Sequence, residues 1–101
     1  MSTPSVYPNI ENISPNRCIP YYLMSSYLYY ERNDNVLTDI DYDKLCKRII
    51  KEWDNITHVH KPFVDKEMLE AGTGYKVEYT NMVVGAANAW LKSWEQEIKN
   101  K

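Results

Sequence analysis

An amphipathic stretch after Thr38 constrains the possible fold more than any other feature of the chain. Its apolar residues recur at positions 0, 3, 4, 7, 8 and 11, and they are Tyr42, Leu45, Cys46, Ile49, Ile50 and Trp53. This spacing places them on one face of an α-helix three turns long. Thr38 followed three residues later by Asp41 resembles a capping box, so we predict a helix from Thr38 to about Asp54.

Two further stretches have helical spacing. The first opens with Pro20 in its first turn and is predicted to end near Arg32, before a turn at residues 33–35. Its apolar face consists of Leu23, Met24, Tyr27 and Leu28. The second runs from an N-cap at Thr80 almost to the end of the chain, with a long apolar stripe. That stripe consists of Met82, Val83, Ala86, Ala87, Trp90, Leu91, Trp94 and Ile98.

Shorter elements are predicted between the second and third long helices. Residues 65–71 form a short helix that ends at Gly72, because glycine is favoured in the left-handed conformation of a helix end. Residues 75–79 alternate in polarity and could form a short extended piece. At residues 85–87 the small side chains would let another helix approach closely.

These elements predict an all-α fold, a small bundle of three main amphipathic helices with an extended N-terminal arm. We assign residues 1–19 to the arm, because Pro4, Pro8 and Pro15 disfavour a long helix there. Residues 20–101 form a single helical domain. The predicted core consists of Leu23, Met24, Tyr27, Leu28, Leu45, Cys46, Ile49, Ile50, Trp53, Val83, Ala87, Trp90, Leu91 and Trp94.

Charge and composition limit the classes of partner. The net charge of −2 argues against direct nucleic-acid binding, which normally needs a basic face. No apolar run approaches the roughly 20 residues of a membrane helix, and the N-terminus lacks the pattern of a secretory signal. Cys18 and Cys46 have no CxxC partner, so we expect reduced thiols and a cytoplasmic location.

Tyrosines and carboxylates form the candidate site. Nine tyrosines are present, and Tyr22, Tyr29 and Tyr30 lie off the apolar face of the first helix. A short turn should bring Asp39, Tyr42 and Asp43 back beside them. We predict that Tyr22, Tyr29, Tyr30, Asp39, Tyr42 and Asp43 bind a ligand or partner, with all but Tyr22 on one shared surface. The alternative is structural: the acids complement the helix dipole, and the tyrosines pack half-buried.

Other reactive residues give no catalytic pattern. His58 and His60 alternate in a loop, but no HExxH or CxxC supports a metal site. Residues 72–74 lack the Lys-Ser/Thr of a phosphate loop, and Cys46 lies on an apolar stripe. We therefore expect neither an enzyme nor a bound metal.

Residues 29–45 resemble the N-terminal helical subdomain of NAD-dependent DNA ligases. That subdomain has a Tyr-His pair at the end of one helix, and Asp-x-x-Tyr-Asp-x-Leu opens the next. Tyr29, Asp39, Tyr42 and Asp43 match without a gap, and His58 falls near a frequent histidine of the family. The resemblance implies that these residues contact the nicotinamide mononucleotide (NMN) half of NAD. Tyr30 replaces the family's histidine.

The adenylation domain that carries the ligase lysine does not fit in 101 residues, so ligase activity is not expected. The whole chain is also similar to small proteins of tailed phages, especially marine ones. We therefore expect a non-catalytic phage accessory protein of the host cytoplasm that docks on a host or viral enzyme. The alternative is an NMN- or NAD-binding module without ligase activity. A homo-oligomer is compatible with either function, and no cofactor is expected beyond NAD or NMN as a ligand.

Overall fold

The computed structural model describes residues 9–34, 36–72 and 79–99 of the chain. The described residues contain no β-strand, and the predicted all-α class is confirmed. Their helices are α1 (Pro15–Glu31), α2 (Asp39–Lys51), α3 (Lys66–Ala71) and α4 (Asn81–Lys99), with single 3-10 turns at Trp53–Asn55 and Lys61–Phe63. No helix in this part of the chain is both long enough and apolar enough to cross a membrane.

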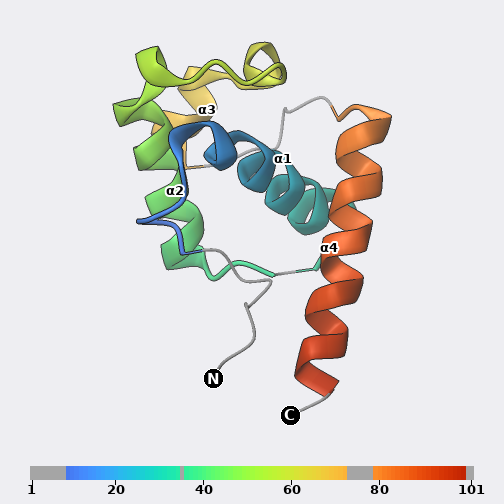
Figure 1. Cartoon of the computed structure of the whole chain (residues 1–101). Coiled ribbons are helices and arrows are strands. Elements are labelled where there is room, and N and C mark those ends of the chain that lie inside the picture. The colour runs from blue at the N-terminus through green and yellow to red at the C-terminus, as the bar shows by residue number, and fades with distance from the viewer. Residues whose placement is uncertain (1–8, 35, 73–78, 100–101) are drawn as a thin grey trace.

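Helix α1 lies at the centre of the bundle, between α2 on one side and α4 on the other (Figure 1). The short helix α3 packs against α2. Because two helices cover α1, two of its faces are buried instead of one. This central position decides which of its tyrosines reach the surface.

Helix α1 begins at Pro15, so the predicted start at Pro20 is wrong, and Pro20 lies inside the helix. A proline in a helix interior costs about 3 kcal/mol. Burial offsets that cost, because Cys18 and Ile19 in the added turn are fully buried, and a side chain the size of Ile19 contributes about 1.5–3 kcal/mol. The added turn is also fixed by Asn16, which exchanges two hydrogen bonds with Thr57.

The described part of the N-terminal arm is not extended as predicted. Residues 15–19 are helical, and residues 9–13 form a turn in which the N–H groups of Asn12 and Ile13 donate to the carbonyl of Asn9. Ile10 is buried, and the Arg48 guanidinium donates to its carbonyl at 2.8 Å. Ile10 therefore holds this turn against α2. Residues 1–8 lie outside the described part.

The predicted caps of the later helices are confirmed. The Thr38 hydroxyl accepts from the N–H of Asp41 at 3.1 Å, and the Thr80 hydroxyl accepts from that of Val83 at 3.2 Å. Gly72 ends α3 with a φ of 71°. Helix α2 ends at Lys51, slightly earlier than predicted, and the 3-10 turn at Trp53–Asn55 continues its course. The extended piece proposed for residues 75–79 lies almost entirely outside the described residues.

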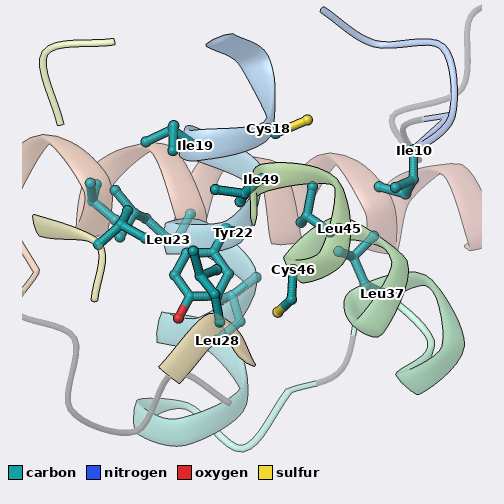
Figure 2. Packing of buried hydrophobic residues seen from close by; sticks show 14 of the residues in the cluster. Ile10, Cys18, Ile19, Tyr22, Leu23, Leu28, Leu37, Leu45, Cys46 and Ile49 are labelled. Carbon is teal, nitrogen blue, oxygen red and sulfur yellow. The ribbon is translucent and has the colours of Figure 1, made fainter. Parts of the chain in front are cut away.

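All fourteen predicted core residues are buried or pack against the buried cluster, part of which Figure 2 shows. Five of them are only partly buried: Met24, Tyr27, Ile50, Trp53 and Trp94. The buried apolar residues that were not predicted are Ile10, Cys18, Ile19, Tyr22, Val36, Leu37, Ile56, Val64, Met68 and Leu69. The small residues 85–87 do not jointly form a surface on which another helix packs closely, since Ala87 is buried but Gly85 and Ala86 are exposed.

Candidate ligand pocket between α1 and α2

A pocket of about 220 Å³ lies where the end of α1 meets the start of α2. It is lined by Ser25, Tyr29, Tyr30, Val36, Leu37, Asp39, Tyr42, Asp43 and Gly72. The five residues predicted to share one surface all line it. Tyr22, the sixth predicted site residue, is not among the lining residues.

Local geometry explains why the two helices meet in this way. Asn33 takes the left-handed conformation with a φ of 56°, and the N–H of Asp34 returns to the carbonyl of Leu28 at 2.8 Å. The chain therefore reverses directly after α1. Val36 and Leu37 are buried and hold the connection against the core.

Tyr22, which was also predicted to bind a ligand or partner, is buried in the core. Its side chain is 0% exposed, and its ring stacks on that of Tyr42 with centroids 5.8 Å apart. Tyr22 lies off the apolar face of α1, as the spacing indicated, but α2 packs over that second face. Tyr22 thus supports the pocket wall from behind.

Tyr42 connects the pocket to the core. Its hydroxyl and that of the fully buried Ser26 form a hydrogen bond of 2.6 Å. Burial raises the pKa of Tyr42 and the pKa of Tyr22 well above the ordinary range of tyrosine. Both phenols therefore stay protonated at neutral pH and act as hydrogen-bonding groups rather than as bases.

Tyr29 and Tyr30 present aromatic surface to solvent beside the pocket. Their side chains are 47% and 37% exposed, and their rings meet edge to face with centroids 4.7 Å apart. An exposed aromatic pair of this kind offers a face on which a flat ring can stack.

The carboxylates give the pocket negative charge. Asp43 forms an ion pair with Lys47 at 2.9 Å, one helical turn further along α2. Within the described residues, Asp39 has no ion-pair partner. Gly72 lies beside Asp43, since a Cβ atom there would lie 3.4 Å from Asp43 Oδ1, an ordinary contact distance. The lining therefore combines hydrogen-bond acceptors with aromatic faces.

The remaining reactive residues do not form a second site. The His60 N–H donates to His58 Nδ1 at 3.0 Å. Across the described part of the chain, no group of three or more His, Cys, Asp or Glu residues could hold a metal ion. Cys18 and Cys46 are free and buried, and burial raises the pKa of the Cys46 thiol to about 12. Such a thiol is inert at neutral pH.

Four lining residues were not predicted. Ser25 lies one turn before Tyr29, so helical spacing alone could have identified it. Val36 and Leu37 are apolar residues in the connection, directly before the Thr38 cap. Gly72 comes from the end of α3, and no local pattern connects it to α1 or α2.

Comparisons with protein-family models, with curated proteins and with solved structures find no match to this chain.

Proposed function

We propose that this protein is a ligand-binding module that holds the nicotinamide end of NMN or NAD. One observation carries the proposal: Tyr29, Asp39, Tyr42 and Asp43 line a single pocket. These are the positions at which the sequence resembles the NMN-binding subdomain of NAD-dependent DNA ligases. A purely structural role for each residue does not require that all four converge on one cavity.

The size of the pocket supports a single ring as the buried group. Its volume of about 220 Å³ is below the roughly 300–1,000 Å³ of pockets that enclose a drug-sized ligand. A nicotinamide ring fits such a space, and the rest of the nucleotide extends outside it.

The lining chemistry suits oxidised nicotinamide. Its ring is cationic, so it gains from the faces of Tyr29 and Tyr42 and from the charge of Asp39. Its carboxamide N–H groups and the ribose hydroxyls are donors that carboxylates accept.

The module binds its ligand without converting it. The phenols of Tyr22 and Tyr42 remain protonated, and the described lining residues include neither a lysine nor a cysteine. In a phage-infected cell, such a module would act in the host cytoplasm as an accessory that captures NMN or NAD.

A second candidate function is docking of a host or viral protein on the same face. The exposed Tyr29–Tyr30 pair favours it, because exposed tyrosines are frequent anchors of protein interfaces. Binding through this pair does not require the carboxylates of the pocket. The two functions therefore differ in their dependence on Asp39.

Calorimetric titration with NMN tests the proposal. Asp39→Asn and Tyr29→Ala should each weaken binding by about tenfold, because they remove a charged acceptor and a stacking face. Asp41→Asn is the matched control: it removes the same charge from the same helix turn, but Asp41 does not line the pocket. It should bind like the parent.

Absence of NMN binding by the parent protein at millimolar concentration would overturn the proposal. Protein docking is then tested by pull-down from infected host lysate, with Asp39→Asn and Tyr29→Ala compared side by side. Loss of one specific partner on Tyr29→Ala alone would select the second candidate.

A further inference from the structure

The charge on one face of α2 changes sign just beyond the pocket. Asp39, Asp43 and Lys47 follow one another at four-residue spacing, so they lie in one row along the helix. Asp43 lines the pocket and contacts Lys47 at 2.9 Å. Lys47 also borders an open groove of about 380 Å³, whose other charged lining residues are Lys44, Arg48, Lys51, Glu11 and Glu52.

We propose that Lys47 and Lys44 form a subsite for the 5′-phosphate of the nucleotide whose ring occupies the pocket. This inference rests on the proposed function, and it adds the part of the site that recognises the phosphate. It also implies that the protein prefers the phosphorylated nucleotide to the nucleoside.

The small pocket leaves the phosphate of the nucleotide outside. A pocket of about 220 Å³ that holds the nicotinamide ring does not also enclose the whole nucleotide. One helical turn, a rise of about 5.4 Å, separates Asp43 from Lys47. A ribose that leaves the pocket along α2 therefore carries its phosphate toward this lysine.

Two arginines near the two helices already make other contacts. Arg32 contacts Asp34 and donates to Asn88 Oδ1 at 2.6 Å, so it is directed toward α4. Arg48 lines the same groove but donates to the Ile10 carbonyl at 2.8 Å. Lys51 also lines the groove, but it lies one helical turn beyond Lys47, so Lys44 and Lys47 are the lysines of α2 nearest to Asp43 in the helix.

The two lysines are exposed, and each has one carboxylate partner that a ligand would have to displace. The Lys47 side chain is 74% exposed, and that of Lys44 is 50% exposed. Lys44 has only a long ion pair with Glu11, at 3.7 Å. A phosphate dianion would compete with Asp43 for Lys47, which would release the carboxylate to accept from a ribose hydroxyl.

The test compares NMN with nicotinamide riboside, which differs only by the phosphate. At low salt the parent protein should bind NMN about three- to tenfold more tightly, the gain expected from two exposed ion pairs. That preference should shrink as the salt concentration rises, because exposed charges are screened.

Lysine variants test whether Lys44 and Lys47 cause the preference for NMN over the riboside. Lys44→Gln combined with Lys47→Gln should abolish the preference for NMN without weakening the binding of the riboside, because loss of Lys47 leaves the Asp43 carboxylate free to accept from the ribose. Lys47→Arg should retain the preference. Lys92→Gln, an exposed charge on α4, is the matched control and should bind both ligands like the parent.

The outcomes separate the two proposals. If neither ligand binds the parent, the proposed nucleotide function is wrong, and the subsite is wrong with it. If both bind with equal affinity, the pocket stands but the phosphate subsite is overturned. A preference that persists in the double lysine variant also overturns the subsite.

Discussion

At the residue scale, Tyr42 belongs both to the core and to the pocket. Its ring stacks on the buried Tyr22, and its hydroxyl shares a hydrogen bond with Ser26 across the α1–α2 contact. The pocket wall is therefore held by the same groups that join the two helices. Changes to this pair should act on stability and on the shape of the site together.

The Ser26–Tyr42 hydrogen bond can be measured by a double-mutant cycle. Ser26→Ala and Tyr42→Phe should each cost about 1–2 kcal/mol, because the remaining hydroxyl loses its partner in a buried place. The double variant should cost less than the sum, with a coupling of about 0.5–1.5 kcal/mol in urea melts. Strict additivity would show that the hydrogen bond contributes nothing. Tyr30→Phe, at the exposed ring, should change stability by less than about 0.5 kcal/mol.

Residue spacing predicts part of the site because helical geometry is local. Tyr29 and Tyr30 end one helix, and Asp39, Tyr42 and Asp43 open the next, so a short turn must bring them together. Tyr22 shows the limit of this reasoning. Its place on the second face of α1 follows from the spacing, but its burial depends on α2 packing over that face.

At the element scale, Thr38 fixes where α2 begins and thus how Asp39 and Asp43 face α1. Its hydroxyl accepts from the Asp41 N–H, one of the donors that the first helical turn leaves without a helical partner. Thr38→Ala should cost about 1 kcal/mol in urea melts, and Thr38→Ser should retain most of the stability. Equal stability of the alanine and parent proteins would contradict the capping role.

Helix α4 contains a glycine that its packing does not require. Gly85 is exposed, and a Cβ atom there would meet nothing within 4 Å. Gly85→Ala should raise the free energy of unfolding by about 0.5–1 kcal/mol, because alanine restricts the unfolded chain and favours the helix. The reverse change at an exposed position of the same helix, Ala89→Gly, should lower it by a similar amount. Destabilisation by Gly85→Ala would contradict an open, helical position for residue 85.

The start of a helix could be predicted from the sequence where a neighbouring side chain caps it. It could not be predicted where packing against distant residues determines the first helical residue. The side chains of Thr38, Asp65 and Thr80 accept hydrogen bonds from backbone N–H groups two or three residues further along the chain. A cap of this kind involves only neighbouring residues, so it can be recognised in the sequence. The start of α1 depends instead on the burial of Cys18 and Ile19 and on the contact of Asn16 with Thr57, which lies far along the chain. No local pattern at Pro15 reveals those contacts.

At the scale of the whole molecule, the central place of α1 explains both the core and the site. Its two buried faces carry Leu23 and Leu28 on one side and Tyr22 and Ser26 on the other. Near its C-terminal end, Tyr29 and Tyr30 reach solvent beside the pocket. Apolar stripes identify the helices, but the stripes alone do not say which helix takes the middle position.

The buried thiols and phenols make stability depend on alkaline pH. Burial raises the pKa of Cys18, Cys46, Tyr22, Tyr42 and Tyr79 in the folded protein, to about 12 for Cys46. In the unfolded chain these groups titrate near about 8.5 for cysteine and about 10 for tyrosine. Above those values the unfolded chain has lost protons that the folded protein retains. The free energy of unfolding must then fall as pH rises.

Urea melts should therefore show a nearly constant free energy of unfolding from about pH 7 to about pH 8.5. Above about pH 8.5 the free energy of unfolding should fall progressively. Each such group contributes a slope of up to about 1.4 kcal/mol per pH unit between its unfolded and folded pKa values. Cys46→Ala should be less stable at neutral pH, because it leaves a cavity, but its stability should fall less steeply with pH. Lys92→Gln, which removes none of these groups, should keep the slope of the parent. A stability that stays constant or rises up to about pH 10.5 would show that these side chains are accessible to solvent in the folded protein, because solvated groups would titrate alike in both states.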